Sequence, residues 1–310
     1  MSEIIPYHVH RLHEWDSFVN TSKNGTFIHK RAFMEYHEDR FVDSSFMIYE
    51  DEQLMGLFPA NSVGDSLYSH QGLTYGGIIL QRNAGLSSVV KWFGELIHQL
   101  KIYFHDVLIK SIPAFYYDPS SFEESYALYH YNAQLVRRDT YFVIDLNREL
   151  CFKKRRLRGI RKGSKYGVKM EKSTNFKPFW NDVLIPNLKK KYNVNPLHSV
   201  KEIEELHQKF PEHIELQCAY LGDELVAGIC MFLTKTTMHA QYIASTKLGR
   251  DIGALDFLID QLINQKSNRR YFSLGITNEK NNLEMNWGLV EWKEGFDSYV
   301  CPQDFYHIKF

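Results

Sequence analysis

The feature that most constrains the fold of this chain is a pattern that occurs twice: strand, tight turn, strand, helix, strand. In the first copy, apolar runs in 45–63 flank a polar turn at 50–53, and a helix with apolar residues at helical spacing is expected over 87–100. In the second copy, segment 213–246 contains the hairpin and a similar helix is expected over 253–265. A duplicated α/β fold with mixed sheets is the simplest interpretation, and chance similarity between two α/β halves is the alternative.

The position of the repeats indicates two lobes. The hairpin glycines Gly56 and Gly228 occupy comparable places in the two copies. We therefore expect an N-terminal lobe over residues 1–150 and a C-terminal lobe over 151–310 that begins with a basic helix. Two further helices are expected in the second lobe, and Ser199 with Glu202 forms the capping box of the second of them.

Composition and missing motifs exclude several classes of protein. The 310 residues carry 37 basic and 37 acidic side chains, so net charge alone favours neither a nucleic-acid nor a membrane partner. The sequence contains no phosphate loop, dinucleotide fingerprint, HExxH or GxSxG motif, which disfavours kinases, dehydrogenases, zinc enzymes and hydrolases. A trio of histidines near the N-terminus, His8, His10 and His13, has no cysteine beside it and is more typical of an exposed surface, so we expect no metal site.

The same evidence predicts a cytoplasmic protein. The four cysteines are far apart and form no CxxC pair, a pattern typical of reduced thiols. No apolar run approaches the ~20 residues that a membrane-spanning helix needs, and the N-terminus lacks the apolar core of a signal peptide.

Two basic features are candidate anion sites. The first is the junction between the strand and the helix of the second copy, which contains Lys247, Gly249, Arg250 and Gly253. Glycines let backbone N–H groups approach a ligand, and the start of a helix favours a phosphate. An ordinary strand-to-helix connection is the alternative.

The second feature is the segment 151–170, which carries nine Lys or Arg and no acidic residue. Its glycines recur every four residues at Gly159, Gly163 and Gly167, which predicts a bare helix face that another element or a ligand approaches closely. Such an uncompensated helix is expected to bind an anion, with a solvated basic face as the alternative. The candidate anion-binding residues are Arg158, Arg161, Lys162 and Lys165.

Three segments resemble the FemABX-like branch of the GNAT acyltransferases. Residues 250–255 are similar to the GNAT pyrophosphate loop, Gln/Arg-x-x-Gly-x-Gly/Ala, but have Leu255 in the third position. The basic run 158–168 resembles the Arg-x-x-Ile-Arg-Lys-Gly/Ala-x-Lys-x-Gly-Val segment of that branch. The closing segment, which includes Leu274-Gly275 and 286–296, resembles the end of FemABX-like sequences, with Asp297 in place of the usual glycine.

The resemblance implies two tandem GNAT-like lobes and an enzyme that transfers an acyl or aminoacyl group to an amine. In GNAT enzymes a splayed strand offers a backbone N–H to the thioester carbonyl, which would place Gln241 and Tyr242 at the centre. His198, in a Pro-x-His-Ser turn, is a candidate for removing a proton from the amine. The resemblance also places Trp292 and Lys293 near the substrates; a surface pairing of Lys293 with Glu291 or Glu294 is the alternative.

The predicted function is an N-acyltransferase that moves an acyl group from CoA to an amine of a sugar or cell-envelope precursor. The resemblance implies acyl-CoA as a co-substrate, bound by the junction that contains Lys247 and Arg250, and no tightly bound cofactor. One alternative is an aminoacyl-tRNA-dependent transferase that builds the peptide bridges of the cell wall. The other is a non-catalytic module that binds a nucleotide sugar.

Overall fold

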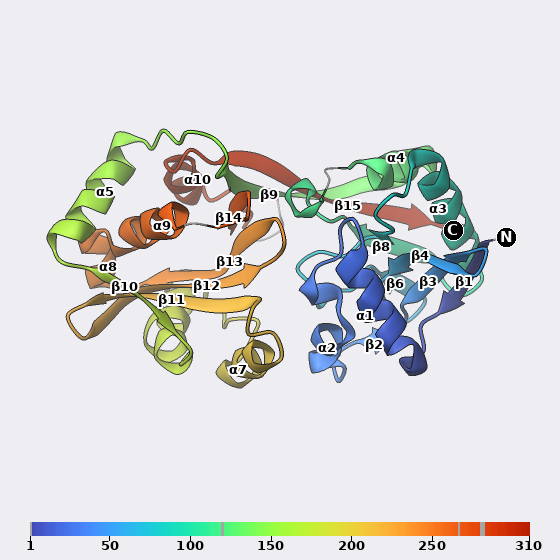
Figure 1. The fold of residues 1–310 in the computed structure, drawn as a ribbon, viewed down its shortest axis with the longest axis horizontal. Helices are drawn as coiled ribbons and strands as arrows, with labels where there is room; N and C mark the ends of the chain where they lie inside the picture. Colours follow the sequence, from blue (N-terminus) through green and yellow to red (C-terminus); the bar gives the residue numbers. More distant parts are fainter. Residues whose placement is uncertain (1, 119–120, 266, 280–282) are drawn as a thin grey trace. The chain divides into compact units, whose positions relative to one another are not determined.

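The computed structural model describes residues 2–118, 121–265, 267–279 and 283–310. They form two compact units (Figure 1): unit 1 contains residues 1–139 and 301–310, and unit 2 contains residues 140–300. The chain leaves unit 1 within β9 (Gln134–Asp145) and returns within β15 (Tyr299–Lys309). This division differs from the expected boundary at residue 150, because the last strand pairs with β8 of unit 1.

Unit 1 is built from short strands and four helices besides 3-10 turns among its described residues. Its strands are β1 (Ser2–Pro6), β2 (Val42–Asp43), β3 (Phe46–Glu50), β4 (Gln53–Phe58), β5 (Asn61–Val63), β6 (Ser66–Tyr68), β7 (Ile79–Leu80) and β8 (Asp106–Lys110). Its helices are α1 (Leu12–Thr21), α2 (Arg31–Met34), α3 (Leu86–Leu100) and α4 (Glu123–His130).

The strands of unit 1 form two ladders. One has the order β1-β3-β4-β7, and the other runs β15-β8-β6-β5-β2. The apolar face of α3, which carries Trp92, Phe93 and Leu96, packs against residues of β3, β4 and β8 in one core. The helical spacing of that face and the turn between β3 and β4, where Asp51 and Glu52 take positive φ, match the expectation from the sequence.

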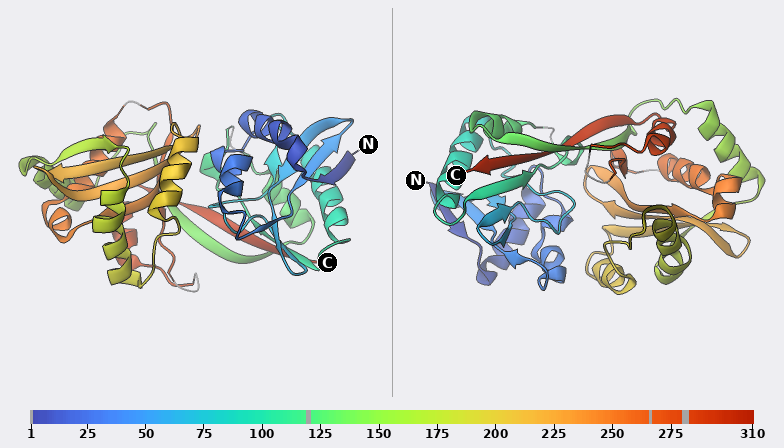
Figure 2. Two further views of the ribbon diagram at one scale, coloured as in Figure 1. Left: turned by 90° about the horizontal axis from the view of Figure 1, so that it is seen from below. Right: turned by 180° about the vertical axis from the view of Figure 1, so that it is seen from behind.

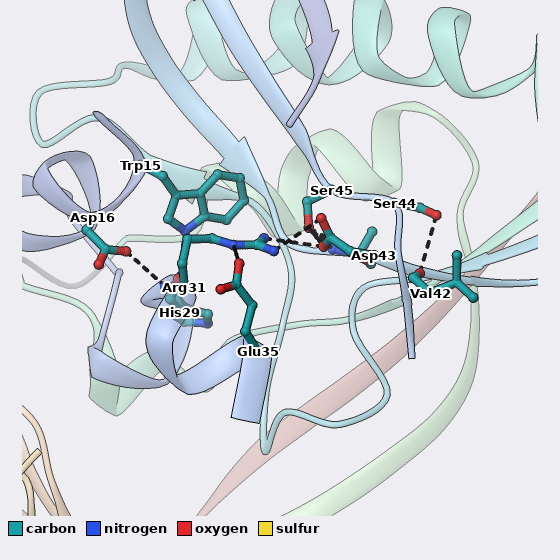
Figure 3. A network of polar contacts seen from close by, with 10 residues as sticks. Trp15, Asp16, His29, Arg31, Glu35, Val42, Asp43, Ser44 and Ser45 are labelled. Carbon is teal, nitrogen blue, oxygen red and sulfur yellow. Dashed lines mark hydrogen bonds and ion pairs between the residues drawn. The ribbon is translucent and has the colours of Figure 1, made fainter. Parts of the chain in front are cut away.

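A buried arginine joins the N-terminal segments of unit 1 (Figure 3). Arg31 is 2% exposed, and its guanidinium donates to Glu35 over 2.8 Å and pairs with Asp43 at 3.2 Å. Its carbon centre lies 3.9 Å from the centroid of the Tyr7 ring, in a cation–π arrangement. The backbone N–H of Arg31 donates to Asp16. Burial of this cation is therefore matched by two carboxylates and an aromatic face.

Unit 2 has longer strands, and its helices lie on both faces of one sheet. Its strands are β10 (Lys169–Ser173), β11 (Ile214–Leu221), β12 (Glu224–Leu233), β13 (Thr237–Ser245) and β14 (Tyr271–Ile276), followed by the second part of β9. Its helices are α5 (Lys154–Lys165), α6 (Ile185–Tyr192), α7 (Val200–Lys209), α8 (Lys247–Ile252), α9 (Ala254–Asn264) and α10 (Trp287–Glu294). A π-helical turn, η5 (Phe179–Leu184), leads into α6.

The strand order of unit 2 is β10-β11-β12-β13-β14-β9, with β13 and β14 parallel and the other pairs antiparallel. Figures 1 and 2 show α9 and α10 on one face of this sheet and α7 on the other. The core on the α9 face contains Leu258, Ile259, Met231 and Phe272. The opposite face packs against η5, where Phe179 fills the space beside Gly228.

The expected capping box is confirmed, because Ser199 accepts from the N–H of Glu202 and the Glu202 carboxylate accepts from the N–H of Ser199. The basic helix is shorter than expected. It ends at Lys165, and Gly167 has a φ of +78° in the turn that follows, with open space around its Cα. Gly167 therefore ends the helix and does not extend a bare face.

No helix in the described part of the chain combines the length and the apolar character needed to cross a membrane. Within the same residues, no three His, Cys, Asp or Glu side chains are grouped closely enough to hold a metal ion.

Candidate functional site

The site begins with a bulge in β13 of unit 2. Cys230 of β12 faces Tyr242, and the next residue, Met231, faces Ala240, so Gln241 is an extra residue without a cross-strand partner. A bulge turns its side chain and backbone away from the regular ladder. The Oε1 atom of Gln241 is buried and has no hydrogen bond of normal geometry within the described residues.

Beside the bulge, β13 and its neighbour β14 stop pairing. The parallel ladder joins Thr237–His239 to 271–273, and β13 then continues to Ser245 without β14. On its other side β14 shifts register against β9 between Ser273 and Ile276, and Gly275 takes a φ of +75° there. The β14-facing edge of β13 is therefore free of strand partners next to Gln241, as far as the described strands show.

Lys293 lies where β13 and β14 separate, and it fixes the backbone of β14. Its side chain comes from α10, is 4% exposed, and donates to the carbonyl oxygens of Gly275 and Ile276 over 2.9 and 2.7 Å. Burial lowers the pKa of Lys293 to about 7. The alternative, a surface pairing of Lys293 with Glu291 or Glu294, is not what the structure has, because Lys293 is buried and those carboxylates pair with Arg155 and Lys153 of the basic segment.

A polar group on the far side of the bulge fixes Tyr242. The Tyr242 hydroxyl accepts a hydrogen bond from the backbone N–H of His198 and forms a second hydrogen bond with Nδ1 of the His198 ring. Trp180 of η5 donates its indole N–H to the carbonyl oxygen of His198 over 2.9 Å and packs edge-on against the Tyr242 ring. The structure thus brings Tyr242 and His198 together. Both are buried on the η5 face of the sheet, away from the basic helix.

The buried His239 interacts with both Lys293 and the Gln241 side chain. Burial and the Lys293 charge together lower the pKa of His239 to about 3, although a hydrogen bond with the Gln241 side chain opposes the shift. His239 is therefore a neutral imidazole at physiological pH and contributes no positive charge where β13 and β14 separate.

The expected phosphate loop is a short helix, α8. Thr246 caps it by accepting the N–H of Gly249, and Arg250 donates to the carbonyl oxygen of Ser245 over 2.7 Å. A Cβ at Gly249 would lie 2.1 Å from the carbonyl oxygen of Val226. A Cβ at Gly253 would lie 2.4 Å from the carbonyl oxygen of Gly159. Both glycines are therefore required by close backbone packing, whatever ligand the junction holds.

Cations surround the end of β13. Lys247 and Arg250 are exposed on α8, three residues apart and so on one helix face. Asn187 of α6 donates to the same Ser245 carbonyl as Arg250 does, over 2.8 Å. Lys191 lies one turn further along α6; partial desolvation and the Arg250 charge lower its pKa.

The glycines of the basic helix face α9. A Cβ at Gly159 would lie 1.9 Å from the Asp256 carboxylate, and one at Gly163 would lie 2.7 Å from Cβ of Phe257. Asp256 accepts hydrogen bonds from Arg156 and from the indole N–H of Trp292. The close approach predicted from the glycine spacing is thus made by another helix at Gly159 and Gly163. Trp292 contributes to the packing of α5 on α9 through its hydrogen bond to Asp256.

Unit 1 differs at the place that corresponds to the bulge. The pairs Gly56–Leu80 and Leu57–Ile79 of unit 1 match Gly228–Ala244 and Ile229–Ile243 of unit 2. Where unit 2 has one extra residue, unit 1 has residues 69–78 between β6 and β7.

The inserted segment is tied to the end of β8. Gly76 donates its N–H to the carbonyl oxygen of Lys110, and the Lys110 ammonium donates to the carbonyl oxygen of Leu73. The backbone N–H of Lys110 in turn donates to Ser69.

The edge of β7 that faces away from β4 is occupied as well, because the Asn24 side chain donates to the carbonyl oxygen of Ile78 and accepts the N–H of Leu80. The edge that corresponds to the unpaired edge of β13 is therefore bonded in unit 1.

Sequence reasoning missed the residues that build the support of this site. Asp256 interrupts the apolar stripe of α9, and an acidic residue in such a stripe signals a buried partner, here Arg156. Trp180, Asn187 and Lys191 come from the segment before α7 and had no motif to mark them.

Comparison with known proteins supports the architecture. No protein-family profile matches the sequence, and no curated protein matches it. Among solved structures, the alignment with FemX covers 99% of this chain and 97% of the FemX chain at 11% identity, with a TM-score of 0.71. The alignment with the structure of L-PGS from Bacillus licheniformis covers 96% of this chain and 91% of L-PGS at 13% identity, with a TM-score of 0.62.

A tandem GNAT protein from the clavulanic acid biosynthesis pathway covers 100% of this chain and 98% of its own at 9% identity, with a TM-score of 0.51. At such low identities the likeness concerns the fold, and it agrees with the duplicated hairpin-helix-strand pattern. The chain therefore has a FemABX-like, GNAT-type fold made of two tandem α/β units.

Proposed function

We propose that this chain is an N-acyltransferase whose unit 2 transfers an acyl group from CoA to an amine of a sugar or cell-envelope precursor. The observation that carries the proposal is the bulge at Gln241 beside the unpaired edge of β13. In unit 1 the corresponding edge of β7 is occupied, because Asn24 bonds to both Ile78 and Leu80 there. The fold shared with FemX and with GNAT proteins supports the reaction class.

The reaction forms one bond and breaks one. The amine nitrogen attacks the thioester carbonyl carbon, the C–N bond forms, the C–S bond breaks, and the proton lost by the amine ends on the departing thiolate. Such a step needs a hydrogen-bond donor to the carbonyl oxygen and a group that orients the amine. A backbone N–H on the free edge of β13 supplies the donor, and Gln241, half-buried at the bulge, orients the amine through its side-chain amide.

The neighbouring residues position these groups. Tyr242 and His198 anchor β13 next to the bulge through their shared hydrogen bond. Lys293 fixes the carbonyls of Gly275 and Ile276 and so keeps β14 from closing on β13. In this proposal the catalytic contact belongs to Gln241, and the other residues are positioning residues.

The donor phosphates are assigned to the cationic end of β13. Lys247 and Arg250 provide charge there, with Lys191 from α6 beside them. Gly249 and Gly253 act by letting α8 and α9 approach their neighbours closely. Charged side chains are thus the main phosphate ligands in this proposal, in place of a glycine-lined loop.

The test is a binding and turnover experiment with the full chain. Calorimetric titration with acetyl-CoA is expected to give one site per chain. Release of free CoA thiol is then followed with amino sugars, nucleotide-linked amino sugars and short peptides as acceptors. Gln241→Leu should lower kcat/KM by roughly a hundredfold if the amine is oriented there, and the exposed Gln265→Leu is the matched control.

Two results would contradict the proposal. No saturable CoA binding at millimolar concentration would remove the donor, and the same titration with aminoacyl-tRNA would then decide for the tRNA-dependent alternative. Equal kcat/KM for Gln241→Leu and the control would place the reaction elsewhere in the chain.

A further inference from the structure

Helix α5 carries five cations on one side. Lys154, Arg158, Arg161, Lys162 and Lys165 are all exposed. At 3.6 residues per turn their directions fall within an arc of about 100°, and they extend over about 16 Å of helix. None of them forms an ion pair with a residue that the structure describes; the recorded pairs of this segment belong to Lys153, Arg155 and Arg156.

The other side of α5 is fixed to unit 2. Gly159 and Gly163 leave no room between α5 and α9. Arg156 is buried and bonded to Asp256 on the same side. The helix therefore cannot rotate to present a different face, and the five cations form a rigid ridge.

The nearby carboxylates of α10 pair with other cations of the basic segment. Glu291 and Glu294 of α10 bind Arg155 and Lys153, and the segment 151–170 contains no acidic residue. Because like charges on neighbouring turns repel one another, the ridge is stabilised by an external anion.

We propose that the ridge of α5 docks unit 2 onto an anionic lipid surface. Two exposed side chains flank the ridge, Leu157 on one side at 37% exposure and Tyr166 on the other at 53%. Aliphatic and tyrosine side chains beside Lys and Arg are typical of the headgroup region of a bilayer. A ridge on the outer side of a helix meets a flat charged surface with all five cations, whereas a groove would favour a nucleic-acid strand.

The expected strength follows from the number of free cations. Each Lys or Arg close to an anionic leaflet contributes about fivefold to partitioning, and the effect decays within about 10 Å at 0.1 M salt. Removal of two ridge charges should weaken vesicle binding by roughly 25-fold. Binding should also fall steeply as salt rises, because the five cations of the ridge are exposed to solvent.

The experiment is co-sedimentation of the full chain with vesicles of phosphatidylcholine alone or with one third phosphatidylglycerol. Binding is expected only to the anionic vesicles, and Arg158→Gln with Lys162→Gln should weaken it. The control is Lys189→Gln with Lys190→Gln on α6, which removes two exposed cations elsewhere and should leave binding unchanged. Glutamine favours helix, so α5 should persist in the variant, and circular dichroism checks this.

A second arm distinguishes the partner. The same proteins are titrated into a labelled RNA duplex and a labelled single-stranded RNA. Absence of binding to anionic vesicles, or equal loss in the ridge variant and the control, would overturn the proposal. Ridge-dependent RNA binding without vesicle binding would also overturn it and assign the ridge to nucleic acid. None of these outcomes depends on whether the chain transfers acyl groups.

Discussion

The burial of Lys293 predicts an unusual dependence of stability on pH. The residue is 4% exposed, and its ammonium donates only to backbone carbonyls among the described residues. An unfolded lysine has a pKa near 10.4, whereas burial lowers the pKa of Lys293 to about 7. Between these values the unfolded chain holds one more proton than the folded chain at this position. The free energy of unfolding therefore rises with pH in that range.

The size of the effect follows from the two pKa values. Well inside the range the slope is about 1.4 kcal/mol per pH unit for one proton. Because titration in the folded state begins near pH 7, the gain between pH 7 and pH 9 is about 2 kcal/mol. Below pH 6 both states are protonated and this contribution becomes constant.

Lys293→Met removes the titrating group and keeps most of its volume. Urea denaturation of the wild type and the variant at pH 6, 7, 8 and 9 should give curves of unfolding free energy that diverge above pH 7. The wild type should gain about 2 kcal/mol more than the variant by pH 9. The exposed Lys190→Met is the control and should run parallel to the wild type. Parallel curves for Lys293→Met would refute the assignment of a depressed lysine pKa.

Two further predictions concern the packing of α5 on α9. Asp256→Ala should lower the free energy of unfolding by about 3–5 kcal/mol, because it leaves the buried Arg156 cation unpaired; a loss below 1 kcal/mol in urea denaturation would contradict the buried pair. Gly253→Ala should cost clearly more than Gly222→Ala. Both glycines have positive φ, worth about 1–2 kcal/mol of strain, but only the first meets a carbonyl, that of Gly159. Equal melting temperatures for these two variants would disprove the tight contact.

The local elements of this fold are predictable from sequence because their signals are local. The turns at 50–53 and 222–224 lie between alternating strands, and the capping box at Ser199 marks the start of α7. The equivalence of Gly56 and Gly228 also follows from the sequence, and their strand registers support it.

The centre of the candidate site was less accessible to sequence reasoning. Both faces of the unit 2 sheet are buried, so β13 carries mainly apolar or aromatic side chains on each face. Tyr242 and Ala244 lie on one face, and Ala240 and Ile243 lie on the other. The bulge shifts the alternation of side chains between the two faces by one residue, but this shift cannot be seen in the sequence because residues on both faces are apolar. The burial of Lys293 depends on α10 packing under β14, which no spacing along the chain records.

The pairing of β15 with β8 has a consequence for how the protein is made. Phe305 lies opposite Lys110, about two hundred residues earlier in the chain, so this contact closes a very long loop. During synthesis, the sheet of unit 2 is assembled from residues 140–300, whereas β8 of unit 1 can pair with β15 only after residues 301–310 have been made. Until then β8 presents an open edge, a place for chaperone binding or mispairing. The unit that is translated first is thus the unit that is completed last.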